Sequence, residues 1–418
     1  MIPRQDLLDD ESAEGLEVFQ LTTETKTPAS HVYMEAQVFT PDGNKMILHR
    51  SANTHAGALN GRLDPEHRFL LCDLEDKGRL IPITDEIGAT SPSIAPDGSC
   101  FYYFVDQTDT AGGRLALKKR RIDGTSPEII MALDGPLPGT KYRPSRLYSL
   151  STISSDGRRL AVSAFFGDGQ AGGAPFGLMV FDLVSATVDL VVQGVSWCNM
   201  HPQYCRSKDI ALSHDVLIQE NHGNICDAQG KIIKLVGGPG ADIHVIRDDG
   251  MNFRNMPWGR NGDEQCQGHQ CWRGRTEWAI TSTITKSVSE NQLVEGKAAP
   301  YIGHEGLKTA EGGRNDLSRK FKKPDFYHFA TDVTGRWLIS DSGPDHESRS
   351  RLYLAGLGEP GLESFRNITY LLAPRISWKK GLHVHPFLSP DGSTAFFNSD
   401  ETGILQAYML RGLPTITR

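Results

Sequence analysis

Apolar, strand-like runs of residues recur along the chain, and the same polar turn introduces each of them. The turn reads Pro-Asp-Gly or a close variant, and it occurs at residues 41–43, 96–98, 155–157, 334–335 and 390–392. Apolar runs follow it, for example at residues 46–48 and 101–105. Proline fixes φ, aspartate caps the turn and glycine accepts a positive φ, so each copy predicts a β-hairpin.

The spacing of these hairpins predicts a β-propeller. Successive copies lie roughly 50 to 65 residues apart if two degraded turns near residues 206–209 and 273–275 are included. A second pair of strand-like runs follows each hairpin, for example at residues 68–74 and 176–183. Seven such units fit the length of 418 residues. We therefore expect an all-β, seven-bladed β-propeller with roughly four antiparallel strands per blade.

A single propeller domain over residues 1–418 accounts for the whole chain. The 43 glycines and 23 prolines are spread through the turns, and no low-complexity linker divides the sequence. Residues 16–21 read as a strand that precedes the first repeat. We expect this N-terminal segment to close the last blade as its outer strand.

Composition and charge narrow the choice of partners and compartment. The formal net charge is −7, and no basic run is interleaved with aromatic residues, so nucleic acid is a poor candidate partner. No apolar segment resembles a signal peptide or a membrane span. Seven cysteines without a regular spacing fit a reducing compartment. These features predict a cytoplasmic protein with no membrane partner. Either a monomer or a homodimer is compatible with the sequence, because propeller edges can support dimers without an obvious sequence mark.

Histidines supply the candidate chemistry. His383 and His385 stand at alternate positions before the last turn, and side chains two apart in a strand point to one face. His201, His269 and His328 occupy corresponding places in other blades, and such places converge on the axis of a propeller. Two interpretations stay open: the imidazoles bind a metal ion together, or they are hydrogen-bonded within polar strand faces.

The order of several motifs resembles that of the oligogalacturonate lyase family over nearly the whole chain. The motifs are Gln20-Leu21-Thr22, the turn at residues 39–43, His201-Pro202-Gln203, Gly268-His269-Gln270-Cys271-Trp272, Tyr327-His328-Phe329 and His383-Val384-His385-Pro386. The resemblance implies a seven-bladed propeller that cleaves short oligogalacturonides by β-elimination. It also implies an acidic oligosaccharide as substrate and a divalent metal ion, usually Mn²⁺, as cofactor.

The same resemblance implies roles for individual residues. It makes His328, His383 and His385 the metal ligands and His269 the general base, and it places His201 and Gln203 in the wall of the substrate pocket. Two features depart from the family. Lys380 stands where the family has a glutamine ligand, and an ammonium group has no lone pair for a metal. The family's arginine in the fourth blade has no clear match in residues 213–223.

The chemistry of β-elimination suits these residue types. The C5 proton of a uronate becomes acidic enough to lose when a metal ion neutralises the neighbouring carboxylate. A neutral imidazole, as at His269, is a suitable proton acceptor near physiological pH. Arg273 or Arg275 could hold a second carboxylate through two hydrogen bonds, or each could be a solvated turn residue.

Two other functions remain open from the sequence. A lyase of the same mechanism could act on a different uronate-containing oligosaccharide. A non-catalytic propeller that resembles TolB-type modules, which also carry Pro-Asp-Gly turns, could bind a protein at the channel mouth. A hydrolase with paired carboxylates ranks below both, because no Asp or Glu pair stands at equivalent blade positions.

Overall fold

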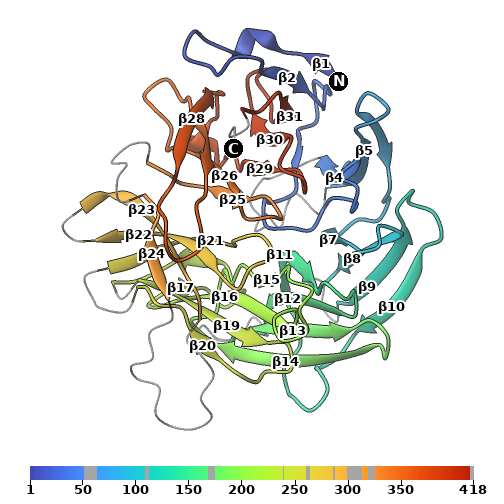
Figure 1. The fold of residues 1–418 in the computed structure, drawn as a ribbon. Helices are drawn as coiled ribbons and strands as arrows, with labels where there is room; N and C mark the ends of the chain where they lie inside the picture. The colour runs from blue at the N-terminus through green and yellow to red at the C-terminus, as the bar shows by residue number, and fades with distance from the viewer. Residues whose placement is uncertain are drawn as a thin grey trace.

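The structure is a computed structural model, and it describes residues 1–50, 64–108, 113–167, 175–238, 240–259, 264–285, 288–298, 313–318 and 325–414. Of residues 288–291 and of Lys380 it describes only the backbone. The described residues form seven antiparallel sheets of four main strands that follow one another around a ring (Figure 1). The predicted all-β, seven-bladed propeller is therefore confirmed.

Blades 1 to 3 follow the predicted order along the chain. Blade 1 consists of β3 (Ala29–His31), β4 (Lys45–Arg50), β5 (Arg68–Asp73) and β6 (Arg79–Pro82). Blade 2 consists of β7 (Ala89–Ile94), β8 (Cys100–Asp106), β9 (Leu115–Arg121) and β10 (Glu128–Leu133). Blade 3 consists of β11 (Arg146–Ile153), β12 (Arg159–Phe165), β13 (Phe176–Asp182) and β14 (Thr187–Gly194). The inner strands are β3, β7 and β11.

Blades 4 and 5 are joined by one β-bridge between Ala241 and Cys266. Blade 4 consists of β15 (Gln203–Tyr204), β16 (Asp215–Asn221), β19 (Ala241–Arg247) and β20 (Arg254–Asn255). A separate hairpin of β17 (Ile225–Cys226) and β18 (Ile232–Lys234) lies between β16 and β19 in sequence. Blade 5 consists of β21 (Glu264–Trp272), β22 (Ala279–Thr285), β23 (Val288–Gly296) and β24 (Arg314–Asp316).

Blades 6 and 7 complete the ring, and the N-terminal segment takes part in it. Blade 6 consists of β25 (Phe329–Thr331), β26 (Trp337–Asp341), β27 (Leu352–Gly356) and β28 (Asn367–Leu372). Blade 7 consists of β29 (Phe387–Leu388), β30 (Ala395–Ser399), β31 (Gln406–Arg411) and β2 (Glu17–Gln20), with β1 (Ile2–Pro3) beyond β2. Figure 1 shows the blue N-terminal strands beside the red β31, with which β2 pairs. Two 3₁₀ turns, η1 (Gln5–Leu7) and η2 (Trp378–Lys380), flank this blade.

The Pro-Asp-Gly turns lie at one end of the inner strands and pack against one another around the ring. Gly98 has a φ of 73°, and a Cβ atom there would lie 2.7 Å from Cδ of Pro41 in the preceding blade. A Cβ at Gly157 would lie 3.3 Å from Cδ of Pro96. The turn glycines therefore provide the positive φ of the hairpin and also the space for the proline of the neighbouring turn.

Buried apolar side chains from neighbouring blades form the core. The ring centroids of Phe104 in β8 and Phe181 in β13 lie 5.3 Å apart, in an edge-to-face arrangement. All of the cysteines lie among described residues, and all of them are free thiols. No helix among the described residues has the length and hydropathy needed to cross a membrane.

Candidate active site

Three histidines from blades 6 and 7 meet at the starts of their inner strands. His328 precedes β25, and His383 and His385 precede β29. A set of possible ligand atoms, one from each imidazole, lies within 4.8 Å of one another. Nε2 of His328 is 3.1 Å from Nδ1 of His383, and the ring centroids of His328 and His385 are 4.5 Å apart. The structure thus brings together the three residues that the sequence singled out.

The reason for this convergence differs from the one the sequence suggested. His383 and His385 lie in an irregular segment before the strand, so the alternation of a β-strand does not orient them. His385 has a φ of 46°, a left-handed conformation that non-glycine residues rarely adopt. Such strained backbone conformations persist where contacts with the surrounding structure enforce them, and they cluster at functional sites.

Asp341, at the end of β26, fixes the orientation of His328. Its Oδ2 lies 2.9 Å from Nδ1 of His328, and its Oδ1 accepts a hydrogen bond of 2.7 Å from the backbone amide of the same residue. Burial raises the pKa of Asp341, and the amide hydrogen bond opposes this shift. A cation at the opposite nitrogen of His328 would favour the ionised carboxylate, which makes Nδ1 the donor and leaves Nε2 as a ligand.

Aromatic rings pack against the three histidines. The indole of Trp378, in η2, stacks on His383 with ring centroids 4.5 Å apart and an interplanar angle of 7°. Tyr33, from blade 1, contacts His385 edge to face at 4.6 Å. These contacts limit the rotation of both imidazoles, so the three side chains are held together before any ligand arrives.

These donors fit a divalent transition metal. Imidazole nitrogens suit transition metals such as zinc, copper, iron and nickel better than calcium, which prefers oxygen ligands. A hydrogen bond that Nδ1 of His328 donates to the Asp341 carboxylate is the arrangement that accompanies metal-binding histidines in proteins. The side chain of Lys380, the residue at the predicted fourth position, lies outside the described part of the chain.

His269 lies beside the three-histidine cluster. It belongs to β21 of blade 5, at a bulge in the pairing with β22. Its ring centroid is 4.6 Å from that of His328 and 5.1 Å from that of Tyr327. The side chain is partly exposed, so a substrate bound at the cluster could reach it.

His201 and Gln203 line the blade 4 side of the same region. Nδ1 of His201 lies 3.0 Å from Oε2 of Glu35, and its Nε2 lies 3.0 Å from the hydroxyl of Tyr148. Tyr33 contacts both His201 and His385, which connects this pair to the cluster. Burial raises the pKa of Glu35, and the nearby His201 opposes the shift. The amide of Gln203 donates to the carbonyl of Gln270 at 2.8 Å.

A cavity of about 330 Å³ lies next to Tyr148 and Asn199. The hydroxyl of Tyr148 donates to the side chain of Asn199 at 2.7 Å and also contacts His201, so the cavity adjoins the histidine region. Arg146 and Lys231 contribute positive charge to its wall. The cavity is large enough to hold part of an oligosaccharide.

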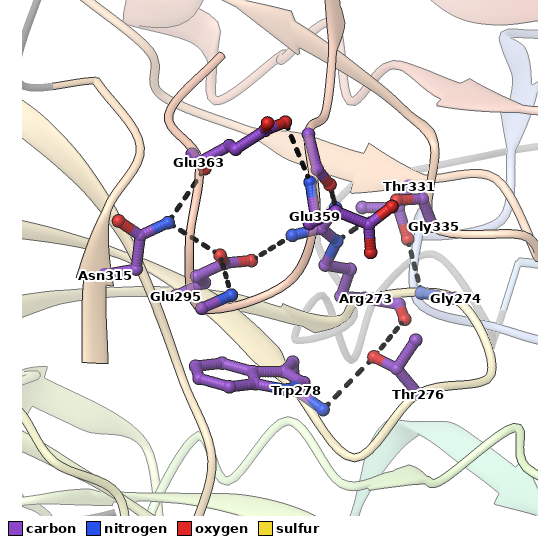
Figure 2. Close-up of polar contacts among 12 residues, drawn as sticks. Arg273, Gly274, Thr276, Trp278, Glu295, Asn315, Thr331, Gly335, Glu359 and Glu363 are labelled. Carbon is purple, nitrogen blue, oxygen red and sulfur yellow. Dashed lines mark hydrogen bonds and ion pairs between the residues drawn. The ribbon is translucent and has the colours of Figure 1, made fainter. Parts of the chain in front are cut away.

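Arg273 does not point toward the histidines. It is 2% exposed, and its guanidinium pairs with Glu295 and donates to the carbonyls of Gly335 and Gly358 (Figure 2). Glu295 itself is fully buried and also accepts from Asn315. All of these partners belong to blades 5 and 6, so Arg273 joins two blades. This geometry argues against the predicted contact between Arg273 and a substrate carboxylate.

Arg275 lies beyond the C-terminal end of β21, in the turn that follows the strand. It lines a cavity together with residues of the Pro-Asp-Gly turns, including Pro41, Pro96 and Pro390. Six residues separate it from His269, and an extended chain advances about 3.3 Å per residue. The expected contact of Arg275 with a substrate bound at the histidines is therefore not supported by its position.

Several residues of the site were not found from the sequence. Asp341 could have been found, because it ends the second strand of blade 6 and a hairpin places that end beside the start of the first strand. Glu35, Tyr33 and Trp378 lie in irregular segments, and no periodic pattern marks them. Tyr148 reads as an ordinary strand residue.

Comparisons with known proteins show the same fold. No family model and no curated protein sequence matches the chain. Among solved structures, the chain is similar to the oligogalacturonate lyase of Vibrio parahaemolyticus, with 16% identity, a TM-score of 0.69 and coverage of 97% of this chain and 96% of that one. It is also similar to an oligogalacturonate lyase in complex with manganese, with 18% identity, a TM-score of 0.67 and coverage of 97% and 95%. A prolyl endopeptidase matches less well, with 10% identity, a TM-score of 0.52 and coverage of 93% of this chain and 51% of that one.

The sequence resemblance is thus confirmed at the level of the fold. The two lyase structures match from end to end, whereas the endopeptidase matches over only about half its own length. The chain has the propeller fold of the oligogalacturonate lyase structures over nearly its whole length.

Proposed function

We propose that the protein is a metal-dependent lyase that cleaves short oligogalacturonides by β-elimination and releases 4,5-unsaturated uronate products. The observation that carries the proposal is the meeting of His328, His383 and His385 beside His269. Metal-ligand chemistry and a candidate base then share one region of the propeller. The fold similarity to two oligogalacturonate lyase structures supports the same reaction class.

His328, His383 and His385 would hold the cation, with Mn²⁺ as the expected metal. A cation held there would neutralise the carboxylate on C5 of the sugar and so acidify the C5 proton. Asp341 keeps Nε2 of His328 directed toward the other two imidazoles. Trp378 and Tyr33 hold those two rings in place.

His269 would take the C5 proton. As the C5–H bond breaks, its electron pair forms the C4–C5 double bond, and the C4–O4 bond to the leaving sugar breaks. Water or another side chain supplies a proton to the departing O4. A neutral imidazole suits the first transfer because its ordinary pKa lies close to physiological pH.

The substrate would extend from the cluster toward blades 3 and 4. His201, which contacts the hydroxyl of Tyr148, and Gln203 would lie along this route, and the cavity beside Tyr148 would provide room for a further sugar. Lys231 and Arg146 in its wall offer positive charge to the carboxylate of that sugar. The residues of the cavity wall are separate from the catalytic histidines. They are therefore the part of the site that would determine the substrate if the protein acts on a uronate other than galacturonate.

Two substitutions separate metal binding from proton transfer. His269→Ala should leave the manganese content unchanged and lower the rate of elimination by about 10²–10⁴-fold. His383→Ala should lose both manganese and activity, because it removes one of three ligands. Metal content is measured by elemental analysis of the purified proteins, and the rate by the ultraviolet absorbance of the unsaturated product of digalacturonate. Full activity in His269→Ala would rule out this residue as the base.

A further inference from the structure

The channel through the propeller has a second mouth, at the end opposite the histidines. A cavity of about 230 Å³ lies there, and residues from all seven blades line it. They come from the ends of the inner strands and from the turns that follow, such as Pro41 of blade 1, Pro96 of blade 2 and Pro390 of blade 7. Along blade 4, five residues separate His201 at the histidine end from Arg206 at this mouth. An extended strand of that length spans about 16 Å, so the two ends of the channel are well separated.

Three positively charged residues line this mouth. Arg206 and Lys208 follow the inner strand of blade 4, and Arg275 follows that of blade 5. Arg206 also lines a second cavity of about 150 Å³ deeper in the channel, where it faces residues such as Met34, Ala330 and Phe387. The guanidinium therefore lies inside the channel, between the two cavities.

In the part of the chain that the structure describes, no carboxylate makes a direct contact with these cations. Arg206, Lys208 and Arg275 form no side-chain hydrogen bond or ion pair with any described residue. Burial lowers the pKa of Arg206, and its electrostatic interactions with Cys271, Asp332, Cys205 and Glu35 oppose this shift without cancelling it. Arg206 is partly buried, and a partly buried cation with no hydrogen-bonded counter-charge costs free energy, since it loses part of its hydration.

The acidic residues of the surrounding turns are already used by their own backbones. Both carboxylate oxygens of Asp332 accept hydrogen bonds, from Thr334 and from the amides of residues 336 and 337. Asp391 accepts from Ser389 and Ser393, and Asp156 accepts from Ser154 and the amide of Arg158. The carboxylates of these turns are therefore occupied by hydrogen bonds within the same turns, whereas the three cations line the cavity.

We propose that this mouth is a binding site for a small oxyanion, a carboxylate or a phosphate, that is separate from the histidine site. Arg206 anchors the anion from within the channel through its planar guanidinium, which can donate two parallel hydrogen bonds to such a group. Lys208 and Arg275 complete the charge at the rim. The cavity is closed on its sides by seven blades, so the ligand is a small molecule and not a polymer.

Two small anions carry such an oxyanion group: a uronate monosaccharide, which has a carboxylate, and inorganic phosphate. Calorimetric titration of the full chain at low salt, in the presence of a chelator, measures both, with galacturonate and phosphate as the two probes. The chelator removes any contribution from a metal at the histidines, so failure of the proposed lyase function would leave this result unaffected. We expect saturable binding of at least one probe, and the tighter of the two identifies the source.

Substitutions test whether Arg206 is the anchor. Arg206→Gln should raise the dissociation constant by about tenfold or more, and Lys208→Gln and Arg275→Gln should each raise it by a smaller factor. Arg79→Gln, at an exposed arginine of β6, is the matched control and should bind as the unaltered protein does. The melting temperature without ligand should not fall in Arg206→Gln, because the substitution removes an uncompensated charge.

The melting temperature gives a second readout that does not depend on heat of binding. The bound probe should raise the melting temperature of the unaltered protein and of Arg79→Gln, and should raise that of Arg206→Gln much less. The proposal is overturned if neither probe binds the unaltered protein, or if Arg206→Gln binds with unchanged affinity.

Discussion

At the scale of single residues, the candidate site depends on the partners that orient its histidines. Asp341 holds His328, Trp378 stacks on His383, and Tyr33 contacts His385. None of these three is a candidate metal ligand, yet each restricts one imidazole. Their contribution can be measured apart from the ligands themselves.

Asp341→Asn should weaken metal binding while the fold is kept. An amide cannot stabilise the donor form of the His328 ring as a carboxylate does, and loss of such a partner typically costs about 10–100-fold in metal affinity. Titration with Mn²⁺ measures the effect. Asp106→Asn is the matched control, because Asp106 is also a buried aspartate at the end of the second strand of its blade, but it lies in blade 2. Equal metal affinity in both variants would contradict the role of Asp341.

Arg273 is expected to matter for stability. Arg273→Ala would leave the carboxylate of Glu295 buried without its charge partner, and loss of one partner of a buried ion pair costs about 3–5 kcal/mol. Arg275→Ala, two residues away and exposed, should change the free energy of unfolding by about 0.5 kcal/mol or less. Denaturant unfolding followed by fluorescence compares the two. Equal free energies of unfolding in the two variants would show that the contact between blades 5 and 6 in Figure 2 does not stabilise the fold.

At the scale of structural elements, the hairpin turns hold the ring together as well as reversing the chain. The turns of blades 1 to 3 each place their glycine against the proline of the turn in the preceding blade, as Gly98 does with Pro41 and Gly157 with Pro96. The recurring Pro-Asp-Gly motif is therefore a motif of blade packing. It also sets the positions of the residues that line the second mouth of the channel.

Gly98→Ala should destabilise the protein more than Gly139→Ala does. Both glycines have a positive φ, 73° and 70°, so both substitutions carry a backbone cost of about 1–2 kcal/mol. A Cβ at Gly98 would also lie 2.7 Å from Pro41, whereas nothing lies within 4 Å of the same atom at Gly139. The difference between the two unfolding free energies, from denaturant titration, isolates the contact between turns. A difference of zero would mean that the turns do not pack as described.

The blades could be predicted from the sequence because their signals are local and repeated. Apolar runs at residues 68–74 and 176–183 became β5 and β13, and the turn motifs ended the inner strands as expected. The segment that carries His383 and His385 was less predictable. Its left-handed residue at position 385 is set by packing against blades 1 and 6, which no local pattern records.

At the scale of the whole molecule, the propeller separates two kinds of chemistry along one channel. Histidines gather at the starts of the inner strands of blades 6 and 7, beside His269 within β21 of blade 5, and arginines and a lysine gather where the inner strands of blades 4 and 5 end. The histidines were identifiable from the sequence, because they recur at the same point of the repeat. The roles of Arg273 and Arg275 were not, because two residues of separation in a turn decide between a buried interface and the channel mouth.

The convergent histidines are the proposed centre of metal-dependent β-elimination in this propeller. The most direct test follows the ultraviolet absorbance of the full chain with digalacturonate and trigalacturonate, first with Mn²⁺ and then after addition of a chelator. We expect the absorbance to rise as the unsaturated product forms, and the chelator to stop the rise. With Mn²⁺ bound to the protein, no rise on either substrate would contradict the proposed reaction, and a rise that the chelator does not affect would contradict the role of the metal.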